Sequence, residues 1–352
     1  MADEVRLLLL GTGGIARQHL DEFGLVPGCA FVACADALPG RAQAYAAAHG
    51  IGHAFSSLAD ALEWGRFDAA VNATPDGVHK DTTLQLLAAG KHVFCEKPLA
   101  PNHADAAQMT EVAEKAGLVN MVNLTYRNAP ALQKARELVL AGALGELRHI
   151  EAAYRQSWLV SRAWGDWRTE PMWLWRLSSK HGSTGVLGDV GVHILDFAAY
   201  GAADDIVSLK ADLANFAKAD GDRIGEYDLD ANDSVTMMGR FRNGALATVV
   251  ATRFATGYQN DLSLALHGTQ GALKVETNGR TSSLKGCFGK DIDKMRWRRI
   301  ECPPTERNAA RFIAAIRAGV NGDPSFRRAA DMQRLIDGAI ESDRTGLAVT
   351  FA

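Results

Sequence analysis

The stretch LLLLGTGGIA, residues 7–16, is typical of a buried strand, a tight glycine turn and the start of a helix. Gly11 permits the turn, Gly13 lets backbone amides approach a pyrophosphate, and Ala16 allows the helix to pack closely on the strand. The N-terminus of a helix favours an anion, because its first N–H groups are unpaired and the macrodipole is positive there. We therefore predict a dinucleotide-binding loop, formed by Gly11, Thr12, Gly13, Gly14 and Ile15.

A glycine pattern alone is weak evidence, but the residues that follow strengthen it. Phe31–Ala35 predict a second buried strand that ends at Asp36, twenty-two residues after Gly14; in this fold an acid about 20 residues on binds the adenosine ribose. A carboxylate there would repel a 2′-phosphate, which favours NAD over NADP. Two alternatives stay open: Arg41 could bind a 2′-phosphate if Asp36 turned away, and Asp36 could instead cap the following helix.

The length of the chain, 352 residues, predicts two domains. Residues 1–125 alternate short apolar runs with alanine-rich helical stretches, which indicates an α/β domain with a doubly wound parallel sheet of the Rossmann type. Residues 126–352 favour an α+β domain with a large, mostly antiparallel open sheet. The terminal helices could pack back on the first domain.

The expected elements follow from hydrophobic periodicity and turn residues. In the first domain we expect strands over 6–10, 30–35, 69–73, 92–95 and 119–123, and helices over 16–23, 41–49, 57–63, 80–89 and 103–116. In the second domain we expect strands over 148–153, 206–214, 234–242, 245–255, 261–268 and 271–276, and helices over 130–141, 186–200, 306–317 and 329–342. Asn243–Gly244 is typical of a tight hairpin turn.

Charge and cysteine content narrow the class of protein. With a net charge of −3 we expect no nucleic-acid partner, and the basic run KMRWRR, residues 294–299, has the alternation of a solvated strand face. The five cysteines form no CxxC pair, which favours free thiols over disulfides or a zinc site. The first apolar run is too short for a signal peptide or a membrane span, so we expect a cytoplasmic protein without a membrane partner.

Two further segments carry residue types suited to hydride transfer. Lys97 follows an expected strand, and ligands of a doubly wound sheet bind at the carboxyl ends of its strands. Asp189 and His193 are four residues apart and would share a helix face. An imidazole suits proton transfer with a hydroxyl, an ammonium stabilises an oxyanion, and a carboxylate orients both.

Each of these residues also has a simpler interpretation. A lysine after a strand is commonly solvated, and an Asp–His pair on a helix is commonly structural. Asp189 and His193 could also be metal ligands, but no third and fourth ligand with suitable spacing accompanies them, so we expect no metal.

The segment 157–177 carries five of the seven tryptophans. Aromatic faces stack on sugar rings and arginines donate paired hydrogen bonds to hydroxyls or a carboxylate, so this segment favours a sugar or polyol pocket. Alternatively it covers the sheet or forms a subunit interface. We expect Trp173 and Trp175 to be mostly structural. The candidates nearer the substrate are Tyr126, Trp167, Arg168 and Arg176.

Over nearly its whole length the chain resembles the large oxidoreductase family that includes glucose-fructose oxidoreductase and inositol 2-dehydrogenase. The resemblance rests on GTGGIA (11–16), NATPDGVH (72–79), CEKP (95–98), NLTYRNAP (123–130) and GDVGVHILD (188–196). It implies a catalytic lysine, aspartate and histidine, which map by motif onto Lys97, Asp189 and His193.

The same resemblance implies the lining of the cofactor site and a cis peptide before Pro98. Thr74 and Pro75 could equally be only a strand-ending turn, and His79 an early helix residue that faces water. The implied lining residues are Thr74, Pro75, His79, Glu96, Lys97 and Asn123, with Arg127 as a neighbour of the substrate.

The sequence thus predicts an NAD(P)-dependent oxidoreductase, with NAD favoured, that transfers hydride between the nicotinamide and a secondary alcohol or ketone of a sugar, polyol or related cyclic substrate. His193 would act as general base in oxidation, Lys97 would polarise the substrate oxygen and Asp189 would position both, although lysine or histidine could take the proton. The alternatives are an NAD-dependent glycosidase that uses transient oxidation and a non-catalytic dinucleotide sensor. By resemblance we expect a homo-oligomer, a dimer or tetramer, formed through the C-terminal sheet.

Overall fold

The computed structural model describes residues 4–351. The chain forms two compact units. The first contains the residues up to 124 together with 306–333, and the second contains 125–305 and the residues from 334 on. The boundary therefore falls inside the long helix α10 (Phe326–Thr345).

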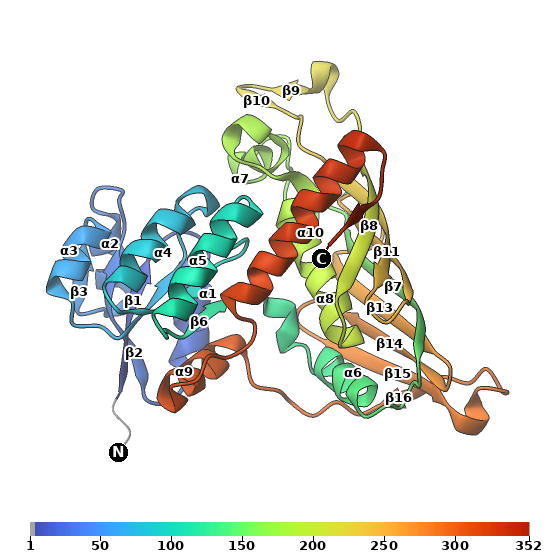
Figure 1. Ribbon diagram of the computed structural model, residues 1–352. Coiled ribbons are helices and arrows are strands. Elements are labelled where there is room, and N and C mark those ends of the chain that lie inside the picture. Colours follow the sequence, from blue (N-terminus) through green and yellow to red (C-terminus); the bar gives the residue numbers. More distant parts are fainter. Residues whose placement is uncertain (1–3, 352) are drawn as a thin grey trace. The chain divides into compact units, whose positions relative to one another are not determined.

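The first unit is a doubly wound parallel sheet, as the sequence predicts (Figure 1). Its six strands lie in the order β3-β2-β1-β4-β5-β6, and all neighbours are parallel. The strands are β1 (Val5–Leu10), β2 (Cys29–Ala35), β3 (His53–Phe55), β4 (Ala69–Asn72), β5 (His92–Cys95) and β6 (Asn120–Val122). The connecting helices are α1 (Ala16–Gly24), α2 (Arg41–His49), α3 (Leu58–Trp64), α4 (His79–Ala88) and α5 (His103–Lys115), with the short η1 (Asp76–Val78). β3 was not expected, because three residues give no readable period.

The continuous leucine run of β1 reflects burial on both faces of the sheet. Leu7, Leu8 and Leu9 are completely buried. One face packs against α9 (Asn308–Ala318), where the ring of Phe312 lies 5.5 Å from that of Phe94 and 6.4 Å from that of Phe23. Late residues of the chain thus complete the core of the first unit.

The second unit is built on a nine-stranded, mostly antiparallel sheet, which confirms the predicted class. The strand order is β16-β15-β14-β13-β7-β12-β11-β8-β17, and β12 with β7 is the parallel pair. The strands are β7 (Leu147–Gln156), β8 (Ile206–Ala214), β11 (Ser234–Phe241), β12 (Leu246–Thr252), β13 (Asn260–Gly268), β14 (Gly271–Thr277), β15 (Ser282–Phe288), β16 (Arg298–Ile300) and β17 (Val349–Thr350), and β9 (Arg223–Ile224) pairs separately with β10 (Tyr227–Asp228). Strands β15, β16 and β17 were not expected from the sequence. The hairpin turn before β12 is confirmed, with Gly244 at a φ of 89°.

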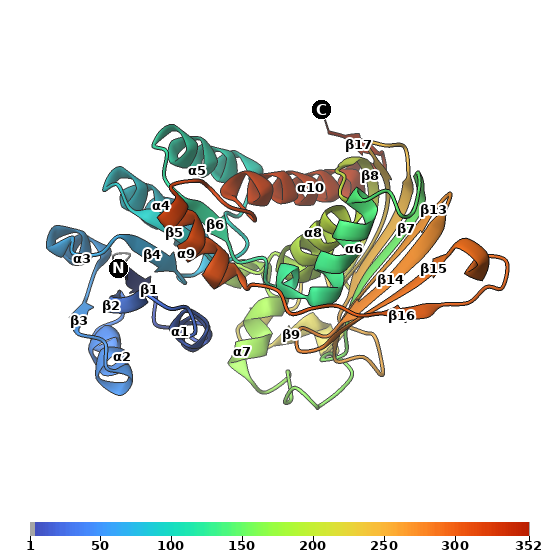
Figure 2. The same ribbon diagram turned by 90° about the horizontal axis from the view of Figure 1, so that it is seen from below.

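Helices α6 (Pro130–Leu140) and α8 (Val192–Ala202) cover one face of this sheet (Figure 2). The expected helix over 186–200 differs at its start, because Leu187–Gly191 form a single π turn, η5, before α8. The π turn matters for the site, because Asp189 lies within it. The remaining short helices are η2 (Thr125–Asn128), α7 (Pro171–Leu174), η3 (Trp175–Leu177), η4 (Ser179–His181), η6 (Asp220–Asp222) and η7 (Gly289–Asp291).

The described residues bear on three expectations: free thiols, the absence of a metal site and the absence of a membrane span. All five cysteines are free thiols, and residues 4–351 hold no cluster of three or more metal-ligating side chains. Across the same range the helices are too short or too polar to span a membrane.

The packing of Phe312 gives the first prediction. Phe312→Ala should lower the free energy of unfolding by about 3–5 kcal/mol, because it removes a fully buried ring and leaves a cavity beneath the sheet. Urea unfolding monitored by circular dichroism measures the change. Val320→Ala, at a residue 65% exposed just after the same helix, is the control and should change stability by less than about 0.5 kcal/mol. Equal midpoints for the two variants would contradict the assignment of α9 to this core.

Candidate active site

The glycine loop after β1 is shaped for a close backbone approach. Gly11 has a φ of +87°, and a Cβ at this position would lie 2.7 Å from the carbonyl oxygen of Ala73. No side chain caps the N-terminus of α1, and its first turn carries no acidic residue. The N–H groups of Ala16 and Gln18 donate within the turn, to the carbonyls of Gly13 and Ile15, so the helix macrodipole is what favours an anion here. Pyrophosphate binding by the Gly11–Ile15 loop stays a prediction.

Asp36 is fixed at the carboxyl end of β2. Its Oδ2 accepts hydrogen bonds from the backbone N–H and the hydroxyl of Thr12, both at 2.8 Å, and its Oδ1 accepts from the N–H of Leu38 at 2.9 Å. Burial raises the pKa of Asp36, but the hydrogen bonds from Leu38 and Thr12 outweigh it, so the pKa lies below its ordinary value. Asp36 thus stays charged and does not turn away.

The two alternatives for this region can now be judged. Asp36 does not cap the next helix, because the N-cap residue of α2 is Gly40 and no side chain caps it. Arg41 lies beside the same loop: its Nε is 3.8 Å from Asp36 Oδ2, and its side chain is 44% exposed. The guanidinium therefore remains available to a ligand of the loop.

His79 is not a helix residue facing water. It is completely buried, with Nδ1 2.9 Å from the carbonyl oxygen of Pro98 and Nε2 2.8 Å from that of Thr74. Carbonyl oxygens only accept, so both ring nitrogens donate and the ring is a cation. Burial lowers the pKa of His79, but Cys95, Asp76 and the Pro98 carbonyl raise it, to about 10 overall. His79 therefore joins two loops rather than presenting its ring to a ligand.

The loop after β4 is ordered by its own polar side chains. The Thr74 hydroxyl donates to Asn72 Oδ1 at 2.7 Å, and Pro75 immediately precedes η1. The turn is thus the strand-ending structure that the sequence allowed, and the Thr74 carbonyl is committed to His79.

Glu96 is the centre of a buried cluster after β5. Its Oε1 accepts from Asn123 Nδ2 at 2.7 Å and lies 2.9 Å from Nε2 of the fully buried His19, while its Oε2 accepts from the N–H of Lys97 at 3.1 Å. Burial raises the pKa of Glu96, but His19 and then Asn123 and Lys97 lower it to about 2. His19 is a residue that the sequence analysis missed. The side chain of Lys97 is half-buried, and the predicted cis peptide before Pro98 is confirmed.

In the second unit, Asp189 lies between two guanidinium groups. Its Oδ2 accepts from Nη2 of Arg253 at 3.1 Å, and its Oδ1 is 3.7 Å from Nη1 of Arg176. Arg253 was not predicted, because nothing near it in sequence suggests a site. Gly188 precedes Asp189, and a Cβ there would overlap the Thr184 side chain.

His193 lies in the first turn of α8, against two tyrosine rings. Its ring makes an edge contact with Tyr126 at 4.9 Å and lies 6.5 Å from the ring of Tyr154. The Tyr126 and Tyr154 hydroxyls are 2.5 Å apart, and Asn260 donates to the first and accepts from the second. This closed network fixes the wall against which His193 packs. Four residues make about one helical turn, so Asp189 and His193 share a side of the η5–α8 segment.

Trp173, expected to be mostly structural, packs against the apolar cluster that contains the substrate candidate Trp167. Trp167 is 3% exposed in an apolar cluster, and its indole N–H donates to the carbonyl of Leu159 because a buried donor needs a partner. Trp173 and Trp175 are partly exposed, and their rings lie 6.0 and 4.6 Å from the Arg176 guanidinium. Arg168 is exposed and stacks on Trp167.

Arg127 lies in the interior of the second unit. It is 2% exposed and donates to both carboxylate oxygens of Asp196, at 2.8 and 2.6 Å, with its guanidinium over the ring of Tyr200. These contacts order η2 against α8. They give Arg127 a structural role, which the resemblance alone did not distinguish from substrate contact.

The glycine loop generates a prediction for cofactor binding. Gly11→Ala should weaken NADH binding at least about tenfold, because the new Cβ meets the Ala73 carbonyl and the positive φ is strained for alanine. NADH fluorescence titration measures the dissociation constant. Gly24→Ala is the control, because a Cβ there meets nothing within 4 Å and its φ is not positive. Equal affinities in the two variants would show that the loop does not hold the dinucleotide.

The cationic His79 generates a prediction for stability against pH. The folded pKa of His79, about 10, exceeds the ordinary histidine value of 6.5, so the stabilisation by the charged ring is complete below about pH 6.5 and lost as pH rises through 10. His79→Gln leaves one carbonyl unpaired and should cost about 1–3 kcal/mol at pH 7. The stability difference from the wild type should shrink toward pH 10 in urea titrations. A constant difference would mean that His79 is neutral; His53→Gln, at an exposed ring, serves as control.

Comparisons with known proteins agree with this geometry. The family "Oxidoreductase family, NAD-binding Rossmann fold" matches residues 5–124, and "GFO/IDH/MocA C-terminal domain" matches 132–274. The 1,5-anhydro-D-fructose reductase of Ensifer adhaerens is 30% identical over 270 residues, 75% of this chain and 74% of the relative. The inositol 2-dehydrogenase of Rhizobium meliloti is 29% identical over 346 residues, 96% of each chain.

A solved structure extends the match to the whole fold. Levoglucosan dehydrogenase in complex with NADH and levoglucosan has a TM-score of 0.88 and 25% identity, covering 99% of each chain. The predicted family, enzyme class and NAD cofactor are confirmed. This chain belongs to the GFO/IDH/MocA family of NAD-binding sugar and polyol oxidoreductases.

Proposed function

We propose that this protein is an NAD-dependent dehydrogenase or reductase acting on a ring carbinol or ring ketone of a cyclic polyol or sugar. The observation that carries the proposal is where the three candidate catalytic residues lie. Lys97 follows β5 closely, and Asp189 and His193 lie on one side of the η5–α8 segment. The name of each relative given above contains a compound of this class as substrate or ligand.

The cofactor loop fits a dinucleotide. Gly11 and its contact with Ala73 leave room that a side chain would fill, and the macrodipole at the start of α1, whose first turn has no acidic residue, favours the phosphates. The ionised Asp36 suits ribose hydroxyls and repels a 2′-phosphate, which supports NAD over NADP. When bound, the nicotinamide supplies the hydride acceptor for oxidation or the donor for reduction.

The side chains of this protein then handle the proton. In oxidation, the substrate hydroxyl gives its proton to the His193 imidazole as charge develops on the oxygen. The Lys97 ammonium donates a hydrogen bond to that oxygen and stabilises its negative charge. Asp189 orients His193 and Lys97. Arg176 offers hydrogen bonds to the substrate ring, and Trp173 and Trp175 offer stacking contacts to it.

The direct test is an assay of NADH formation with cyclic polyols, anhydrosugars and aldoses at saturating NAD. We expect steady NADH formation with at least one ring polyol, and slower turnover with NADP. Sustained sugar release without accumulation of NADH would instead identify a glycosidase. Absence of both reactions, with intact NADH binding, would identify a sensor.

The roles of Lys97 and His193 yield a mutational prediction. Lys97→Ala and His193→Ala should each lower kcat by about 10²- to 10⁴-fold, because each removes a group that acts in the transition state. NADH affinity should be retained in both variants, as measured by fluorescence titration. Lys91→Ala is the control: Lys91 precedes β5 and donates to the carbonyls of Gly65 and Phe67, so its loss should leave kcat unchanged. Full turnover in either active-site variant would contradict the assigned chemistry.

A further inference from the structure

Arg253 is a fully buried cation at the end of β12. Its side chain is 0% exposed, and by volume it is the largest of the completely buried side chains among the described residues. Its backbone N–H donates to the Asp233 carbonyl at 3.0 Å, so the main chain at this point is bonded to the residue just before the start of β11. Burying a charge in this way is costly unless it is paired and hydrogen-bonded.

The guanidinium of Arg253 reaches two separate parts of the second unit. Nη2 donates to Asp189 Oδ2 at 3.1 Å, and Nη1 donates to the backbone carbonyl of Arg176 at 3.0 Å. The flat face of the group lies 4.9 Å from the ring of Trp158. One buried side chain thus fixes the carboxylate on η5 and the backbone of the tryptophan-rich segment.

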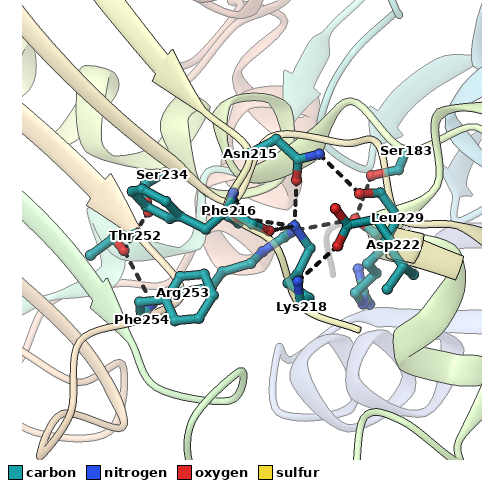
Figure 3. Close-up of polar contacts among 12 residues, drawn as sticks. Ser183, Asn215, Phe216, Lys218, Asp222, Leu229, Ser234, Thr252, Arg253 and Phe254 are labelled. Carbon is teal, nitrogen blue, oxygen red and sulfur yellow. Dashed lines mark hydrogen bonds and ion pairs between the residues drawn. The ribbon is translucent and has the colours of Figure 1, made fainter. Parts of the chain in front are cut away.

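A second buried cation, Lys218, is hydrogen-bonded to a different carboxylate. Lys218 Nζ donates to Asp233 Oδ2 at 2.7 Å and to the Phe216 carbonyl at 2.7 Å, as well as to Asn215 (Figure 3). The charge of Asp233 also acts on Arg253, but without a hydrogen bond between their side chains. Arg253 forms its carboxylate hydrogen bond with Asp189 instead.

The partly exposed Asp189 needs such a partner to keep one orientation. Its side chain is 25% exposed, and the second guanidinium, on Arg176, lies at 3.7 Å and is 31% exposed. The contact between Asp189 and Arg176 is therefore long, and Arg176 is partly exposed to solvent. The hydrogen bond between Asp189 and Arg253 is shorter, and Arg253 is completely buried. Burial lowers the pKa of Arg253 while Asp189 raises it, and a guanidinium remains charged near neutral pH, so Asp189 has a positive partner there.

We propose that Arg253 is a positioning residue for the reaction: it holds the Asp189 carboxylate in its working orientation and ties that orientation to the backbone that carries Arg176. The inference rests on the proposed function, because it assigns Arg253 a role through Asp189. Arg253 itself touches neither substrate nor cofactor in this scheme.

A double-mutant cycle tests the inference. Arg253→Met should lower kcat about 10- to 100-fold while the substrate KM and the NADH dissociation constant change less than about threefold, because only orientation is lost. In an Asp189→Asn background the same substitution should change kcat by less than about twofold. Arg253→Lys, which keeps the charge, should recover part of the lost kcat.

Lys218→Met is the matched control, because it removes a buried cation of the same unit that pairs with a different carboxylate. It should lower the melting temperature without lowering kcat of the folded protein. If Arg253→Met does not fold, the same cycle is run with Arg253→Lys, which should lower kcat in the wild-type background and not in Asp189→Asn.

The outcomes separate the two proposals. An equal loss from Arg253→Met in both backgrounds, or a loss of stability without loss of kcat, overturns the positioning role and leaves the proposed function standing. Unchanged kcat in Asp189→Asn itself overturns the role of Asp189 in the proposed function, and the inference with it. A loss confined to the wild-type background supports the positioning role.

Discussion

Six parallel strands place the loops that follow β1, β2, β4, β5 and β6 at a single edge of the first sheet, and the loops of neighbouring strands contact one another there. Asp36 binds Thr12, which joins the loops after β2 and β1. Gly11 approaches Ala73, and His79 binds the carbonyls of Thr74 and Pro98.

Glu96 joins the loops after β5 and β6, because it accepts a hydrogen bond from Asn123. Three of these contacts, those of Asp36, His79 and Glu96, involve a buried or half-buried ionisable side chain. These side chains bind other groups of the same edge, and such mutual hydrogen bonds lower the ordering cost of binding a ligand.

Much of this arrangement was readable from the sequence, because it depends on local signals. The glycine loop, Asp36 and the EKP motif follow predicted strands, and the strand order of a doubly wound sheet brings strand ends together. In the second unit the sequence predicted six of the nine strands of the large sheet, but not the order in which they pair. Its strands pair across long separations, and short strands such as β16 carry no period of their own.

The site residues that were missed share one physical cause. Arg253 is 64 residues from Asp189 in sequence, and His19 is 77 from Glu96, so only the tertiary fold reveals these pairs. The burial of Trp167 has a similar origin. Composition shows that tryptophans and arginines are concentrated in one segment, but which indole is buried depends on where a carbonyl can accept its N–H, and that acceptor is Leu159.

The surroundings of Asp189 also bear on which group carries the proton in the proposed reaction. A carboxylate between the guanidiniums of Arg253 and Arg176 is stabilised in its charged form, because both partners are cations. Such a group is suited to orientation and poorly suited to accept a proton near neutral pH. The acceptor must then be an imidazole or an amine. We propose His193, packed against the Tyr126 and Tyr154 rings and close to Asp189 along the same segment, as the group of the second unit that takes the proton and returns it.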